Sequence, residues 1–319
     1  MKQTFSTWKP SANSVELLGH IQDVLDVYAQ QGYLLTLRQL YYQMVSRDLF
    51  PDDRRWSLAG SRWIRDPQGT KNAEPNYKWL GEILSNGRLA GYVDWDMIED
   101  RSRVLKKTAT WDNPREIIEA AANSYHVDPW EDADNHVEVW AEKDAVSNIL
   151  EPVCRELEVA FIANRGYSSQ SAMYTAYKRF QLAIGRGKTC RIIYFGDHDP
   201  SGIDMSRDIQ ARLSFFLYGD VDGFDGVERV ALNMDQIERF NPPKDPAKVT
   251  DSRYRAYVER FGESSWELDA LEPKVLSELA RHAVIQYVDR PAWRRAGIKE
   301  QAGKDEIMKI AESMEDADE

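Results

Sequence analysis

The sequence predicts an α/β protein in which a helical N-terminal part precedes a mainly parallel sheet. Before residue 90, apolar side chains recur mostly at helical spacing. From residue 136 onward, short apolar runs alternate with longer amphipathic stretches, as strands and helices do in a parallel sheet. The chain has 319 residues, of which 42% are hydrophobic and 29% charged, which is ordinary for two globular domains.

Two helices are expected at the start of the chain. An apolar stripe predicts the first over residues 14–31, and Gly32 ends it. Thr36 is a typical N-cap, and Gln39 three residues later completes a capping box. The second helix is therefore expected to begin at Leu37 and to run to about residue 47.

The next segment is expected to contain a loop, a third helix and a strand. Residues 51–74 are rich in Asp, Arg, Gly and Pro, which is typical of a loop. Apolar spacing predicts a helix over 76–86, and residues 91–98 alternate as a strand does. Three helices followed by a strand indicate either a winged helix-turn-helix or a generic helical cap.

The second half of the chain is expected to form the sheet. Residues 99–135 are polar, are typical of a linker and contain one expected helix at 114–123. The region 241–266 is rich in loops. Between them, strands are expected at 137–141, 159–163, 190–195 and 227–232, and helices at 144–157, 169–184 and 201–217.

Acidic residues directly follow two of the expected strands. Glu142 follows the first, and Asp197 and Asp199 follow the third. Ligands bind at the carboxyl ends of strands in open parallel sheets, so these carboxylates are placed at one edge. Three carboxylates in one pocket repel one another unless a cation joins them, and oxygen ligands suit Mg²⁺. The alternative is a turn in which an aspartate caps a helix.

Neighbouring residues leave several alternatives open. His198 is more typical of a packed side chain than of a ligand. Lys143 either touches phosphate or is a solvated surface residue. Glu267 and Asp269 either supply further carboxylates to the site or start a helix. Arginines interleaved with tryptophans over 54–65 indicate either a nucleic-acid groove or a loop anchored by its aromatic side chains.

The two acidic motifs together resemble a Toprim signature. Its glutamate is Glu142 and its Asp-x-Asp is Asp197-His198-Asp199, followed by Pro-Ser-Gly. This form most resembles the A subunit of type IIB topoisomerases (topoisomerase VI) and its meiotic double-strand-break relatives. That family places a winged helix with an Arg-x-x-Tyr-Tyr motif before the Toprim domain, and Arg38-Gln39-Leu40-Tyr41-Tyr42 matches it. The resemblance covers about 14–98 and 136–290.

The resemblance implies a function and a set of partners. Tyr42 would be the nucleophile, Arg38 would assist it, and Glu142, Asp197 and Asp199 would hold Mg²⁺, with Mn²⁺ as a substitute. The expected reaction is cleavage of double-stranded DNA by transesterification through a 5′-phosphotyrosine. A homodimer is implied, in which the tyrosine of one subunit meets the metal site of the other, with an ATPase partner subunit.

The helix itself separates the two tyrosines. Tyr41 belongs to the apolar stripe of the second helix and is expected in the core. Tyr42 lies about 100° further around, at the margin of the stripe, and is expected to be exposed. Arg38 lies four residues earlier on that face. The alternative is an ordinary exposed pair on an amphipathic helix.

Two other functions stay open at this stage. One is a hydrolytic Toprim nuclease of the mobile-element or defence type, in which metal-activated water replaces the tyrosine. The other is a DNA-binding subunit of a larger complex without catalytic activity.

Composition and charge set the remaining expectations. The net charge of −12 argues against nucleic-acid binding, but arginines gather within 38–65. The two cysteines form no zinc motif, and no signal peptide or membrane span is expected, so we predict a cytoplasmic protein. We expect a winged-helix domain over 1–130, a Toprim domain over 131–300 and an acidic tail over 301–319.

Overall fold

The N-terminal part is built on three helices. The computed structural model describes residues 2–99, 108–218 and 221–314. Helices α1 (Ala12–Gln30), α2 (Leu37–Ser46) and α3 (Glu74–Leu89) pack around a shared apolar core, as expected. The side chains at its centre are Leu17, Ile21, Leu25, Leu40, Met44 and Leu80.

The predicted capping box at the start of α2 is confirmed. The Gln39 backbone N–H donates to Thr36 Oγ1 at 3.3 Å, and the Thr36 N–H donates to Gln39 Oε1 at 2.8 Å. Two backbone donors that a helix start leaves open are thereby satisfied. The box fixes where α2 begins, and hence which way Arg38 and Tyr42 point.

The segment between α2 and α3 is not a plain loop. A short helical turn (Asp52–Arg54) precedes two antiparallel strands, β1 (Trp56–Ala59) and β2 (Arg62–Arg65). Gly60 has a φ of 63° in the turn that joins them, a value that glycine adopts without strain. The prediction of a loop over 51–74 is wrong for these strands.

The strand predicted at 91–98 is also wrong. A short helical turn, η2 (Trp95–Met97), occupies its second half, and Asp94 caps that turn by accepting from the Asp96 N–H. Only an isolated bridge between Leu35 and Ile98 has strand character. The order of three helices followed by a strand is therefore wrong, and a hairpin lies between α2 and α3 instead.

The predicted parallel sheet is confirmed. Strands β3 (Asn135–Ala141), β4 (Ala160–Ala163), β5 (Thr189–Phe195) and β6 (Phe224–Ala231) are all parallel, in the spatial order β4-β3-β5-β6. Alternate side chains of β3 enter two different cores, with Val139 in one and Trp140 in the other. Both faces are therefore covered, as parallel sheets require.

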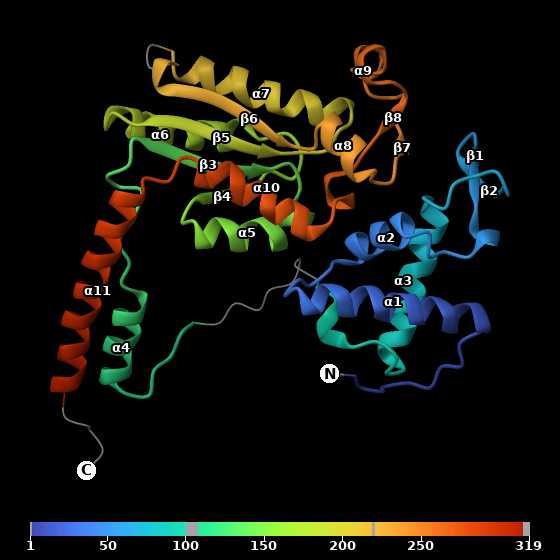
Figure 1. The fold of residues 1–319 in the computed structure, drawn as a ribbon, viewed down its shortest axis with the longest axis horizontal. Coiled ribbons are helices and arrows are strands. Elements are labelled where there is room, and N and C mark those ends of the chain that lie inside the picture. The colour runs from blue at the N-terminus through green and yellow to red at the C-terminus, as the bar shows by residue number, and fades with distance from the viewer. Residues whose placement is uncertain (1, 100–107, 219–220, 315–319) are drawn as a thin grey trace.

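Helices cover the two faces of the sheet in pairs (Figure 1). Helices α5 (Ser147–Glu156) and α10 (Pro273–Ile285) pack on one face. Helices α6 (Gln170–Gly185) and α7 (Pro200–Phe216) pack on the other. The helices predicted after the first three strands are confirmed, except that the first begins with a separate short turn, η3 (Asp144–Val146).

An irregular segment follows β6 and returns to the carboxyl edge of the sheet. It starts with α8 (Met234–Phe240) and contains α9 (Tyr254–Phe261), where sequence predicted mostly loop. A bridge between His198 and Trp266 ties it to the loop after β5. Its remaining elements are β7 (Asp245–Pro246), β8 (Ser264–Ser265) and the turn η5 (Leu268–Ala270).

Two helices distant in sequence lie side by side at one end of the molecule (Figure 1). These are α4 (Pro114–Ser124) and the last helix, α11 (Arg290–Ser313). Residues 301–313 of the expected acidic tail belong to α11, and residues 315–319 lie outside the described part. In the ranges that the structure describes, no helix is both long and apolar enough to span a membrane.

Candidate metal centre

The loops that carry Glu142 and Asp197 follow the two central strands, β3 and β5, from which the chain continues to opposite sides of the sheet. From β3 the chain moves outward to β4, whereas from β5 it moves to β6 on the opposite side. The loops that follow two neighbouring strands therefore diverge and leave room between them. Glu142 follows β3 and Asp197 follows β5, so these two loops lie beside each other at the carboxyl edge of the sheet.

Three carboxylates form a compact group at this edge. One oxygen from each of Asp197, Glu267 and Asp269 lies within 4.8 Å of the others. Glu267 and Asp269 flank Leu268 at the start of η5, and the Leu268 N–H donates to Asp197 Oδ1 at 2.7 Å. This bond holds η5 against the loop after β5. We call Asp197, Glu267 and Asp269 the acidic cluster.

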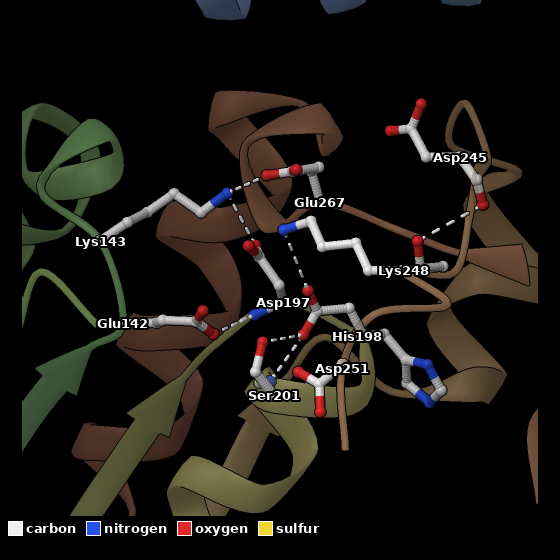
Figure 2. A network of polar contacts seen from close by, with 12 residues as sticks. Glu142, Lys143, Asp197, His198, Ser201, Asp245, Lys248, Asp251 and Glu267 are labelled. Carbon is white, nitrogen blue, oxygen red and sulfur yellow. Dashed lines mark hydrogen bonds and ion pairs between the residues drawn. The ribbon is translucent and has the colours of Figure 1, made fainter. Parts of the chain in front are cut away.

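The ammonium of Lys143 lies within the acidic cluster (Figure 2). Its Nζ is 2.7 Å from Asp197 Oδ1, 2.5 Å from Glu267 Oε2 and 3.0 Å from Asp269 Oδ1. Burial lowers the pKa of a lysine, but here the three carboxylates outweigh burial and raise it well above its usual value. Lys143 is therefore a charged internal partner, not the surface residue or phosphate contact considered above.

Arg38 supplies a second cation to the acidic cluster from α2. Its Nη2 is 2.9 Å from Glu267 Oε1, and its Nε is 3.2 Å from Asp269 Oδ2. Burial raises the pKa of a carboxyl group, yet Lys143 and Arg38 outweigh it and lower the pKa of Glu267 to about 2. Arg38 thus joins the N-terminal helices to the carboxyl edge of the sheet.

Glu142 lies behind the loop after β5 and outside the acidic cluster. Its Oε2 accepts from the Asp197 backbone N–H at 2.8 Å. A Cβ atom added at Gly196 or at Gly202 would come within 2.9 Å of this oxygen, so the loop encloses it closely. Burial raises the pKa of Glu142, and the charge of Asp199 adds to the effect. In this arrangement Glu142 positions Asp197.

Asp199 caps the helix that follows. Its Oδ1 accepts from the Gly202 N–H at 2.6 Å and from Ser201 Oγ at 3.0 Å, while Lys248 Nζ is 3.8 Å from Oδ2. As expected, His198 points away and packs against aromatic rings. Of the predicted trio Glu142, Asp197 and Asp199, the structure places one residue in the acidic cluster and two beside it.

Tyr42 is buried, which corrects the prediction that it is exposed. Only 4% of its surface is accessible, the same as for Tyr41. The reason is tertiary, because η5 covers the side of α2 that the apolar stripe leaves open, and Ala270 joins the same core. The predicted pairing is nevertheless present, since Arg38 Nη2 donates to the Tyr42 hydroxyl at 3.2 Å.

The environment of Tyr42 opposes ionisation. Burial raises the pKa of its hydroxyl, and the nearby charge of Glu267 adds to the rise, while Arg38 lowers it. Replacing the ammonium of Lys143 by a more highly charged cation would favour the phenolate. The hydroxyl is therefore a protonated neighbour of the acidic cluster in this state.

One cavity connects these groups. It has a volume of about 350 Å³ and lies between α2, α3, the hairpin and the segment after β6. Arg38, Tyr42, Asp197, Asp199 and Glu267 all line it. The structure thus gathers four of the five predicted site residues around one space within a single chain, with Glu142 directly behind.

The site also depends on a residue that sequence did not single out. Arg229 on β6 is largely buried and donates to the carbonyl oxygens of Gly196, Asp197 and Gly202 at 2.9, 2.5 and 3.0 Å. It fixes the path of the loop that carries Asp197 and Asp199. An arginine at an interior position of a strand was the available signal, because such a charge needs buried partners.

The donor set is chemically suited to a hard divalent cation. All three groups of the acidic cluster offer carboxylate oxygens, the ligands that Mg²⁺ and Mn²⁺ prefer. Burial raises the pKa of Asp197 well above its usual value, while the charge of Lys143 opposes that rise. Asp269 Oδ2 is buried and accepts no hydrogen bond, so its partner is the ion pair with Arg38 Nε at 3.2 Å. Since Lys143 holds the central position, an ion can enter only if this side chain moves.

Comparison with known proteins gives no family assignment. No family model matches the chain, and no curated protein matches it.

Proposed function

We propose that this protein is a divalent-metal-dependent DNA strand-cleaving enzyme of the type IIB topoisomerase A-subunit kind. The observation that carries the proposal is the meeting of Arg38 and Tyr42 with the acidic cluster in one cavity. These groups come from sequence motifs more than 150 residues apart. The Arg-x-x-Tyr-Tyr motif and the Asp-x-Asp motif thus act at one site.

The topology supports the Toprim part of the proposal. The signature has a glutamate after one strand and Asp-x-Asp after a later strand, and here the two strands, β3 and β5, are also neighbours in the sheet. The sheet has four parallel strands covered on both faces. For the N-terminal part, the hairpin lies between α2 and α3 and not after the third helix, so the winged helix is proposed from the resemblance alone.

In the proposed reaction, the site residues would have separate roles in binding the metal ion and the phosphate. Asp197, Glu267 and Asp269 would hold the Mg²⁺ or Mn²⁺ ion, with Glu142 and Asp199 fixing the loop. When bound, the cation would stabilise negative charge on the leaving 3′ oxygen. Arg38, released from its carboxylate partners, would contact the scissile phosphate and favour the Tyr42 phenolate.

Cleavage by Tyr42 would conserve the energy of the broken phosphodiester bond in a phosphotyrosine ester. The tyrosine oxygen bonds to phosphorus, and the bond from phosphorus to the 3′ oxygen breaks. The phenolic proton passes to solvent, and the 3′ oxygen gains a proton. The product is a 5′-phosphotyrosine and a free 3′-hydroxyl, and the reverse reaction reseals the strand.

One observation favours a hydrolytic nuclease as the second candidate. Tyr42 is buried and its hydroxyl pKa is raised, which makes the phenol a weak nucleophile in this state. Water activated by a cation at the acidic cluster would attack without an ionised tyrosine. The two candidates share the acidic cluster and differ only in the attacking oxygen.

Supercoiled plasmid with Mg²⁺ or Mn²⁺ tests the proposal. The tyrosine mechanism predicts nicked or linear DNA that enters the gel normally only after protease treatment. Tyr42→Phe abolishes both cleavage and the covalent adduct, whereas Tyr41→Phe is the matched control on the same helix. Cleavage that persists in Tyr42→Phe establishes hydrolysis. DNA binding without cleavage by the wild type identifies a non-catalytic subunit.

The partners follow from the resemblance. Double-stranded DNA is the proposed substrate, and a homodimer with an ATPase partner subunit is the proposed assembly.

The arginines near the hairpin stack on tryptophans, with Arg54 3.7 Å above Trp79 and Arg65 4.3 Å above Trp56. The contact with Arg65 supports the anchored-loop interpretation for Trp56, whereas Trp79 lies on α3, outside the 54–65 segment, and Trp63 stays unexplained.

A further inference from the structure

The cavity beside the acidic cluster has aromatic walls. Trp63 from β2, Tyr77 from α3 and Trp266 before η5 line it and are each partly exposed, while Tyr41 and Tyr42 close its base. The cavity is open on one side, and its volume of about 350 Å³ lies at the small end of the range for ligand pockets. It admits a single planar ring system with its sugar and is too small for a duplex.

Trp63 differs from the other tryptophans of the N-terminal hairpin region. Trp56 and Trp79 each lie under an arginine, and Trp56 Nε1 also donates to Asn76 Oδ1 at 2.9 Å. Among the described residues, Trp63 has no aromatic or cationic group stacked on its ring. It is the half-buried side chain of β2 and lines the cavity. Its ring is therefore available to a ligand.

Carboxylates outnumber cations around the cavity, which disfavours a phosphate that brings no cation with it. Carboxylates of Asp197, Asp199, Asp245 and Glu267 line it, against the cations Arg38 and Lys248. A phosphate pushed among these groups would be repelled, whereas a nucleobase carries no charge and has two faces for stacking. The phosphate belongs at the acidic cluster with its cation, and the neighbouring base belongs among the aromatic rings.

We propose that this cavity binds one extruded nucleobase next to the scissile phosphate, with Trp63 as its stacking partner. The proposal rests on the proposed function, because DNA reaches the cavity only if the acidic cluster receives its phosphate. It adds a substrate class, namely DNA with an unpaired or easily unstacked nucleotide at the cleavage position. Enzymes that extrude a base bind such substrates better, since unstacking is already complete.

Binding to three labelled oligonucleotides tests the proposal. These are a paired duplex, the same duplex with a one-nucleotide bulge, and the single strand, each titrated with the full chain in Ca²⁺ to limit cleavage. The wild type is expected to bind the bulged duplex about tenfold more tightly than the paired one. Trp63→Ala is expected to remove this preference.

Two further variants control for the loss of the Trp63 side chain. Trp63→Phe retains a stacking surface and is expected to keep most of the preference. Trp111→Ala removes a tryptophan that is 44% exposed before α4, and it is expected to change nothing. Equal affinity of the wild type for paired and bulged duplexes overturns the proposal, as does a preference that survives in Trp63→Ala. Competition by free dAMP as strong as that by the bulged duplex also overturns it, in favour of a mononucleotide site.

The binding test of the base pocket and the cleavage test of the proposed function can fail independently. Plasmid cleavage without any preference for unpaired nucleotides would leave the enzyme intact and remove the base pocket. A Trp63-dependent preference in a protein that never cleaves plasmid would keep the base pocket and remove the catalytic proposal.

Discussion

Lys143 occupies the position that the surrounding carboxylates would otherwise offer to a cation. Buried charges are tolerated only when they are paired, and three carboxylates share this one ammonium and Arg38. Metal binding must therefore displace a protein cation that the fold already provides. The site would be stable without metal, and its affinity for metal would be set by how readily Lys143 leaves.

Replacing Lys143 with methionine tests this competition. Lys143→Met keeps the side-chain length and removes the charge, so without metal we expect a loss of about 3 kcal/mol of folding free energy. Mg²⁺ or Mn²⁺ should restore that stability, because the ion binds the folded state. Affinity for Mn²⁺ should rise at least about tenfold. Thermal unfolding with and without metal, together with calorimetric titration, measures both effects.

The control is a lysine at the rim of the same cavity. Lys248 is 70% exposed and lies 3.8 Å from Asp199, so Lys248→Met should change stability little. If Lys143→Met behaves like this control in both measurements, then Lys143 does not compete with a metal ion.

Glu142 offers a second test at the scale of one residue. Its carboxylate accepts a backbone hydrogen bond and lies outside the acidic cluster, so Glu142→Gln keeps an acceptor and should keep most Mn²⁺ affinity, within about threefold. Asp197→Asn removes a ligand charge and should lose about tenfold or more. Titration of both variants decides the matter. Similar losses would mean that Glu142 turns toward the ion and binds it directly, as the Toprim resemblance implies.

Among the elements, those set by local signals were predictable from sequence. The capping box of Thr36 and Gln39 fixed α2, and the alternation of apolar runs with helices gave the four strands of the sheet. The hairpin was missed because each strand has four residues and only Trp63 of β2 is even partly buried. The strand at 91–98 was wrong because Asp94 caps a helical turn there, using the same residues that suggested alternation.

The site was predictable only in part, for a related reason. Glu142 and Asp197 follow neighbouring parallel strands, so topology alone brings them together. Glu267 and Asp269 reach the acidic cluster through η5, whose contact with Asp197 joins residues 71 positions apart. The spacing of apolar residues along the sequence gives no signal for such a long-range contact. The same turn buries Tyr42, which helix geometry alone placed at an exposed margin.

The loop after β5 depends on a close approach at Gly202. A Cβ atom there would lie 2.3 Å from the Asp197 carbonyl oxygen and 2.9 Å from Glu142 Oε2. Gly202→Ala should therefore displace the loop, destabilise the fold by about 1–3 kcal/mol and weaken Mn²⁺ binding. Gly185, at the end of α6, has open space, so Gly185→Ala should be neutral or slightly stabilising. Urea unfolding compares the two, and equal stabilities would show that the loop adapts freely.

At the scale of the whole molecule, the candidate site brings together segments that lie far apart in the sequence. Helix α2 brings Arg38 and Tyr42, the sheet brings Asp197, and the segment after β6 brings Glu267. All of these groups meet within one chain. The resemblance instead implies that the tyrosine of one subunit meets the metal site of another, so the two arrangements make opposite predictions for a mixture of damaged chains.

Co-expression of Tyr42→Phe with Asp197→Asn distinguishes these arrangements. If each site forms within one chain, every chain in a mixed dimer lacks one essential group, and plasmid nicking stays absent. If sites form between chains, the intact tyrosine of one chain meets the intact aspartate of the other, and one site per mixed dimer nicks DNA. From the contacts of Arg38 with Tyr42, Glu267 and Asp269 in one chain, we expect no restoration. Wild type co-expressed with Tyr42→Phe is the positive control, and protease-dependent nicking by the two damaged variants together would establish the shared site.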